Sequence, residues 1–110
     1  MKGKPGDRCF DFETGRPLPE TFVNSALTGW NGRATLTSPE RGIAAEISAS
    51  APLTTVILYS PSGQADFVCI EPVSHSVDAH NRSDLGTAPP HILAPGAQLA
   101  IETTIRPFSI

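Results

Sequence analysis

Cysteine is scarce in this sequence. Its two cysteines, Cys9 and Cys69, lie 60 positions apart, so neither forms the closely spaced pair that metal and redox motifs require. His75, Asp78 and His80 are near one another, but no second cluster of ligands completes a coordination sphere. The pattern therefore argues against a metal site and predicts that Cys69 is a small apolar residue in a buried strand.

Positive charge and long apolar runs are also lacking. The formal net charge is -3, no lysine follows Lys4, and the arginines are scattered, so no surface for phosphate backbones is predicted. No apolar run approaches the ~18 residues that a membrane-spanning helix needs. No apolar signal segment follows Lys2 and Lys4. We therefore expect neither nucleic acid nor membrane as a partner and predict a cytoplasmic protein.

Helical periodicity is absent, since no stretch keeps apolar residues at helical spacing for three turns. The 110 residues suffice for one domain with a modest core. Residues 1–20 are interrupted by glycine and proline and predict an irregular arm, and residues 21–110 read as six or seven strands. The fold class expected is an all-β antiparallel β-sandwich, or part of one. The main strands are expected at residues 22–27, 34–37, 43–50, 53–60, 66–71 and 98–107.

Two turns and one loop punctuate these strands. The Gly-Trp-Asn-Gly sequence at 29–32 predicts a tight hairpin turn, with Trp30 covering one edge of the core. Pro95 and Gly96 predict a second turn. Between Glu71 and His91 no periodicity is visible, and loops of that length are usually functional or disordered.

Glu71 is the most informative single residue. It follows four consecutive apolar residues that predict a strand buried on both faces. Because a proline disfavours the helical region for the residue before it, Pro72 should hold Glu71 extended and end the strand there. A partly desolvated carboxylate at a strand mouth can accept a proton near neutral pH. The alternative is a strand-end glutamate that points into water.

Two blocks of sequence resemble the C-terminal signature of the aldose 1-epimerase (galactose mutarotase) family. The first is FVCIEPVSH at 67–75, followed by DAHN at 78–81 and LAPG at 93–96. The second is LTGWNGRA at 27–34, which is similar to the family's Phe-Thr-Gly-Trp-Asp-Gly-x-Ala block. The resemblance implies that this chain corresponds to the C-terminal portion of a longer protein, as part of a galactose mutarotase-like super-sandwich.

The resemblance also implies an activity, the interconversion of the α and β anomers of a hexose. It assigns Glu71 as the catalytic base and places Asn24 against the sugar, with Trp30 and His75 as candidates for lining the pocket. No cofactor is implied. The family's acid is a histidine in an upstream motif that no part of this sequence matches. Asn24 has an equally simple alternative, because asparagine often closes turns.

Two other functions stay open on the sequence. One is a sugar-recognition module without turnover, in which Glu71 and Asn24 hydrogen-bond hydroxyl groups. The other is purely structural, an incomplete sandwich that self-associates through exposed strand edges to bury its core.

Overall fold

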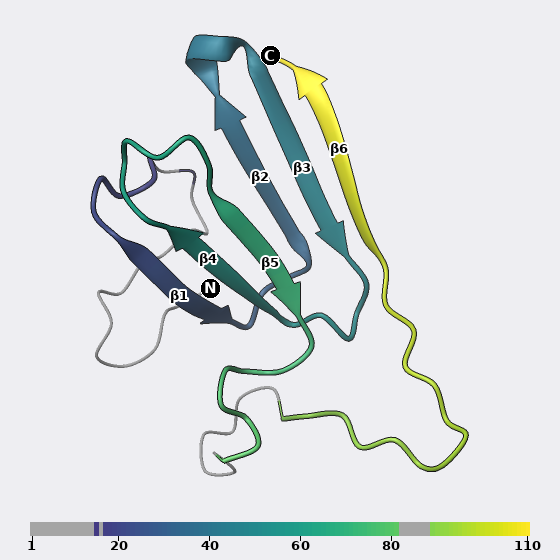
Figure 1. The fold of residues 1–110 in the computed structure, drawn as a ribbon. Helices are drawn as coiled ribbons and strands as arrows, with labels where there is room; N and C mark the ends of the chain where they lie inside the picture. The colour runs from purple at the N-terminus through teal and green to yellow at the C-terminus, as the bar shows by residue number, and fades with distance from the viewer. Residues whose placement is uncertain (1–14, 16, 82–88) are drawn as a thin grey trace.

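The computed structural model describes residues 15, 17–81 and 89–110, and it is all-β. Its elements in chain order are β1 (Val23–Thr28), β2 (Arg33–Ser38), the 3-10 turn η1 (Pro39–Arg41), β3 (Ile43–Ala49), β4 (Thr55–Ser60), β5 (Cys69–Val73) and β6 (Thr103–Ser109). They form two three-stranded antiparallel sheets, ordered β1-β4-β5 and β2-β3-β6 (Figure 1). The expected all-β antiparallel architecture is confirmed. The described residues contain no helix that is long and apolar enough to span a membrane.

The strand pairing differs from a chain of hairpins. Residues 29–32 were predicted to close a hairpin, yet β1 pairs with β4 and β2 pairs with β3. The segment therefore crosses from one sheet to the other. It begins and ends with the left-handed glycines Gly29 and Gly32, at φ 67° and 83°. The Oδ1 atom of Asn31 accepts a hydrogen bond from the backbone N–H of Arg33 at 3.0 Å, which is an Asx turn rather than a hairpin turn.

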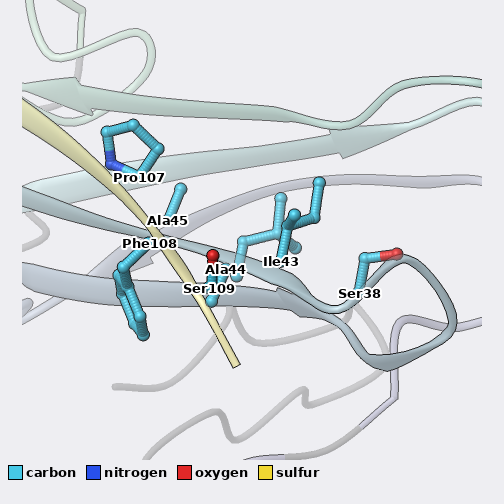
Figure 2. Close-up of a pocket in the computed structure, with 8 residues that line it drawn as sticks. Ser38, Ile43, Ala44, Ala45, Pro107, Phe108 and Ser109 are labelled. Atoms are coloured by element: carbon cyan, nitrogen blue, oxygen red, sulfur yellow. The ribbon is translucent and has the colours of Figure 1, made fainter.

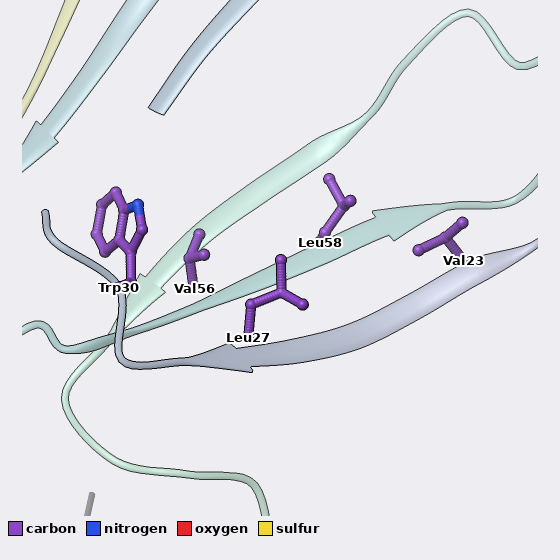
Figure 3. Packing of buried hydrophobic residues seen from close by; sticks show 5 residues of the cluster. All are labelled: Val23, Leu27, Trp30, Val56 and Leu58. Carbon is purple, nitrogen blue, oxygen red and sulfur yellow. The ribbon is translucent and has the colours of Figure 1, made fainter. Parts of the chain in front are cut away.

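The core lies on the inner face of the β1-β4-β5 sheet, where it meets the other sheet. Side chains from β1 and β4 project to the same side and pack with the indole of Trp30 (Figure 3). Trp30 donates a hydrogen bond from Nε1 to the carbonyl of Arg33 at 2.7 Å, which satisfies the one polar atom of the ring. Ala34 and Ala49 of the second sheet pack against this group. The five buried members of the cluster are Val23, Leu27, Trp30, Val56 and Leu58.

β5 corrects the prediction for residues 66–71. The strand begins at Cys69 and runs through Pro72 to Val73, and none of its residues is fully buried. It is an edge strand with one neighbour, so the missing N–H of Pro72 can face the open edge without costing a ladder bond. All five residues of the strand are at least partly exposed, so it is not buried on both faces. Glu71 is accordingly exposed in mid-strand rather than partly desolvated at a strand mouth.

β6 is shorter and later than the predicted strand at 98–107. Its pairing starts with Thr103 opposite Ala49, the last residue of β3. Residues 98–102 have no neighbouring strand, although Glu102 exchanges hydrogen bonds with Ser50, through its carbonyl and its N–H, both at 2.9 Å. The predicted arm at 1–20 lies largely outside the described residues. Its end is tied to the fold, since Leu18 packs on the core and Gly63 N–H bonds the Glu20 carbonyl at 2.8 Å.

One buried hydroxyl suggests a stabilising substitution. Thr55 is 0% exposed, and its Oγ1 atom has no hydrogen-bond partner among the described residues. An unsatisfied buried donor costs about 1–3 kcal/mol, whereas valine has a similar shape and favours strands. We expect Thr55→Val to raise the free energy of unfolding by about 1 kcal/mol, measured by urea denaturation. The exposed Thr35→Val is the control and should change it little; destabilisation by Thr55→Val would mean that the hydroxyl is bonded.

Candidate functional site

Glu71 lies on the outer face of the β1-β4-β5 sheet, opposite the core. In the β4-β5 register it stands beside Ile57, which in turn stands beside Ala26 of β1. Directly opposed residues of antiparallel strands project to the same face, and neighbours along a strand alternate. The outer face thus comprises Asn24, Ala26, Thr28, Thr55, Ile57, Tyr59, Cys69, Glu71 and Val73.

The same register places Asn24 on the outer face with Glu71. Asn24 stands beside Tyr59, which stands beside Cys69, and Glu71 is two residues further along β5. Two strand spacings and two residue rises separate the Cα atoms of Asn24 and Glu71 by ~12 Å. Both side chains are exposed. Two polar residues that lie 47 positions apart in the sequence therefore flank one stretch of sheet surface.

Tyr59 stands directly beside Asn24 and belongs to a row of aromatic rings that sequence reasoning did not assign to a site. Its ring centroid lies 6.0 Å from that of Phe22 in an edge-on arrangement, and 6.3 Å from that of Phe67 in a tilted one. Phe22 and Phe67 are 62% and 56% exposed. The alternation of β4 indicated which residues share a face with Tyr59, but only the pairing of three strands brings the two phenylalanines to it.

Trp30 lies on the other side of the sheet. Its side chain is 5% exposed within the core cluster, so the structure confirms its expected place at the edge of the core. In the described structure it does not share the outer face with Glu71. Its role in pocket lining stays a prediction of the resemblance.

His75 lies in the turn that follows β5, and its imidazole is half-buried. Its Nδ1 atom is 3.0 Å from the carbonyl oxygen of Ser76. Because a carbonyl only accepts, Nδ1 carries the proton, and in the neutral ring Nε2 is then an acceptor.

His80 packs against His75 in the same turn, with ring centroids 6.0 Å apart in an edge-on arrangement. The turn is closed by Asp78, whose φ is 60° and whose carboxylate accepts a 2.7 Å hydrogen bond from the amide of Asn81. That bond commits Asp78 to a local structural role. The described residues hold no group of three or more His, Cys, Asp or Glu side chains arranged to bind a metal.

The electrostatics of the outer face are simple. Glu71 is the one charged residue among its nine members. The arginines Arg33 and Arg106 belong to the other sheet. Both approach Glu46 of that same sheet, with N–O distances of 3.9 and 3.5 Å. Cys69, predicted as a buried small hydrophobe, is a half-buried free thiol on the outer face. The face offers a carboxylate, an amide and aromatic rings, which suits a neutral ligand with hydroxyl groups better than an anionic one.

Comparisons with known proteins give one informative relative. The chain is 37% identical over 102 residues to the uncharacterized protein YphB of Escherichia coli (strain K12). The match covers 87% of this chain and 34% of that protein, so the chain spans about a third of the length of the curated relative it matches. No family model matches the chain, and no solved structure matches it.

Proposed function

We propose that this chain contributes the base-bearing part of a sugar-isomerising site of the aldose 1-epimerase type. The observation that carries the proposal is that Glu71 and Asn24, the two residues singled out by the resemblance, are both exposed on the outer face of one sheet. The substrate class is a neutral hexose, because Glu71 is the one charge on that face. The two sheets would form part of a mutarotase-like super-sandwich.

The reaction requires one base and one acid. Glu71 takes the proton of the anomeric hydroxyl while an acid protonates the ring oxygen, so the bond between C1 and the ring oxygen breaks and an open-chain aldehyde forms. Rotation about the C1–C2 bond presents the other face of the carbonyl, and the reverse proton transfers close the ring. Atoms and electrons balance without a cofactor. Asn24 can both donate to and accept from hydroxyl groups, which orients the sugar.

The acid is the missing component. His75 lies in the turn after β5, beyond the strand that carries Glu71, and its Nδ1 atom is engaged with the Ser76 carbonyl at 3.0 Å. We therefore assign the acid to polypeptide outside this chain, equivalent to the part of the longer relative without a counterpart here. The assignment agrees with the resemblance, in which the acid belongs to an upstream motif.

The aromatic row favours a second candidate function, sugar binding without turnover. Phe22, Tyr59 and Phe67 form a row of aromatic rings, and Tyr59 stands beside Asn24 in the strand register. Binding sites for small molecules combine such aromatic surfaces with a few polar groups that fix orientation. A sugar offers an apolar face of C–H groups to the rings and hydroxyl groups to the polar side chains.

Polarimetry tests the proposed isomerase function. The rate of mutarotation of fresh α-D-glucose and α-D-galactose is measured with the 110-residue chain mixed with the unmatched part of the longer relative, to which the acid is assigned, and with Glu71→Gln and Glu40→Gln, the control, in the same mixture. Glu40 is an exposed carboxylate in η1, which connects β2 and β3 of the other sheet. A general base contributes about 10²–10⁴ to a rate, so we expect Glu71→Gln to abolish any acceleration and Glu40→Gln to keep it.

Sugar binding is measured on the same samples, by the chemical-shift changes of backbone amides on titration with each hexose. Shifts around β4 and β5 without acceleration would support the binding function in place of turnover. A folded mixture that neither accelerates mutarotation nor shows sugar-dependent shifts would contradict both functions. Equal activity of Glu71→Gln and the unmodified chain would contradict the assignment of the base.

A further inference from the structure

The β2-β3-β6 sheet has one strongly apolar face. Its register aligns three rows, Ala34 with Ile47 and Ile105, Leu36 with Ala45 and Pro107, and Ser38 with Ile43 and Ser109. We call these nine residues the apolar face. No charged residue is among them.

The opposite face of the same sheet carries charged and hydroxyl side chains. Glu46 lies there between Arg33 and Arg106, and the guanidinium of Arg106 sits 5.0 Å from the ring centroid of Phe108. Thr35 and Thr37 of β2 are exposed on this side. The contrast between the two faces is that of a sheet with one side packed and one side solvated.

Only one end of the apolar face is covered. Ala34 packs against the core cluster of the first sheet, and Ile47 beside it is 7% exposed. Towards the other end and the outer strand the cover is missing, since Ile43 is 50% exposed and Ile105 is 68% exposed. Figure 1 shows the same arrangement, with β2, β3 and β6 extending past the β1-β4-β5 sheet.

A pocket of about 440 Å³ lies at this uncovered end. Figure 2 shows Ala45 and Pro107 on one side of the strands and Phe108 on the other. The side chains that line the pocket are apolar except for those of Ser38 and Ser109, and none is charged. A small-molecule site needs convergent polar groups to orient its ligand, so the lining fits a polypeptide better than a sugar.

The strand edges favour a partner that covers the face over one that extends the sheet. Pro107 lies within β6, and β6 is an edge strand. Its missing N–H leaves a gap in the row of donors that an added strand would need. β5, an edge of the other sheet, carries Pro72 in the same way. The sequence left open a self-association through exposed strand edges. At the edges formed by β5 and β6, the two prolines disfavour it.

The longer relative indicates what covers the face. About two thirds of that protein has no counterpart in this chain, while the matched third is 37% identical to it. We propose that the apolar face docks polypeptide equivalent to the unmatched part of that relative, which closes the sandwich over β2, β3 and β6. The inference does not depend on the proposed sugar chemistry, because the apolar face belongs to the other sheet.

The test uses the full 110-residue chain, co-expressed with a tagged polypeptide of the relative that lacks the matched residues. Purification by the tag and light scattering measure whether a 1:1 complex forms. Ile105→Lys puts a charge on the apolar face at an exposed position, and Thr35→Lys puts the same charge on the opposite face as the control. Circular dichroism verifies that each variant is folded.

We expect a 1:1 complex with the unmodified chain and with Thr35→Lys, and at least a 10-fold smaller yield of complex with Ile105→Lys. The soluble yield of the tagged polypeptide should fall in parallel, which is a readout that needs no soluble isolated partner. Absence of a complex with the folded unmodified chain, or equal loss in both variants, would overturn the proposal. A homodimer of the 110-residue chain that Ile105→Lys dissociates would overturn it in favour of a second copy.

Discussion

Trp30→Ala is expected to remove most of the stability of this fold. Trp30 is one of five buried residues that form the core cluster, and its Nε1 atom donates a hydrogen bond to the carbonyl of Arg33, the first residue of β2, at 2.7 Å. Replacing a buried tryptophan by alanine costs about 3–5 kcal/mol. Domains of this size have about 5–15 kcal/mol in total, and a core this small places the chain near the lower limit.

Urea denaturation followed by circular dichroism measures the effect. At a slope of about 1.5 kcal/mol/M the midpoint should fall by roughly 2–3 M. Trp30→Phe keeps a large ring and loses the hydrogen bond, so we expect a loss of about 1–2 kcal/mol. Phe22→Ala removes an aromatic ring that is 62% exposed and should cost much less than Trp30→Ala. If Phe22→Ala and Trp30→Ala were equally destabilising, the placement of Trp30 in the core would be wrong.

Gly32→Ala is the second substitution with a large expected effect. Gly32 has a φ of 83°, and a Cβ atom there would lie 2.9 Å from the carbonyl oxygen of Ala49. A left-handed conformation costs an alanine about 1–2 kcal/mol, and the contact with backbone adds to it. The Gly32 carbonyl also accepts the 2.9 Å hydrogen bond from Ala49 N–H, so relief of the clash would weaken the β2-β3 junction. We expect a total loss of about 2–4 kcal/mol.

Gly29→Ala is the matched control for Gly32→Ala. Gly29 has a φ of 67°, but a Cβ atom there would meet nothing within 4 Å. Its loss should therefore be limited to the conformational cost of about 1–2 kcal/mol. The two free energies of unfolding, measured side by side in urea, separate backbone strain from the steric contact. Equal losses would contradict the close approach between Gly32 and Ala49.

A sequence motif identified residues of the candidate site but did not place them on a common surface. Glu71 and Asn24 were identified from the resemblance, and nothing in the local sequence places them on one surface. The shared face follows from the β1-β4-β5 register, in which a slip by one residue would turn either side chain to the core. Tyr59 joined the candidate site for the same reason.

Local sequence by itself determined the strand character of this protein. Period-two alternation and breaks at glycine and proline placed β2, β3 and β4 within two residues of their observed bounds. These features act through neighbouring residues, since they fix backbone dihedral angles and the side to which each side chain points. The composition likewise indicated a chain with few charges and a small core.

Tertiary structure alone decided the partners of each strand. The segment at 29–32 has the residues of a hairpin turn, yet β1 pairs with β4, because long-range burial of Val23, Leu27, Val56 and Leu58 on one face outweighs a local turn preference. The exposure of Glu71 follows from its place on the outer face, and the tolerance of Pro72 follows from β5 lying at an edge. The apolar face follows from β6 pairing with β3 across more than fifty residues. Pairing and edge position depend on contacts between distant segments, and local propensity carries no information about them.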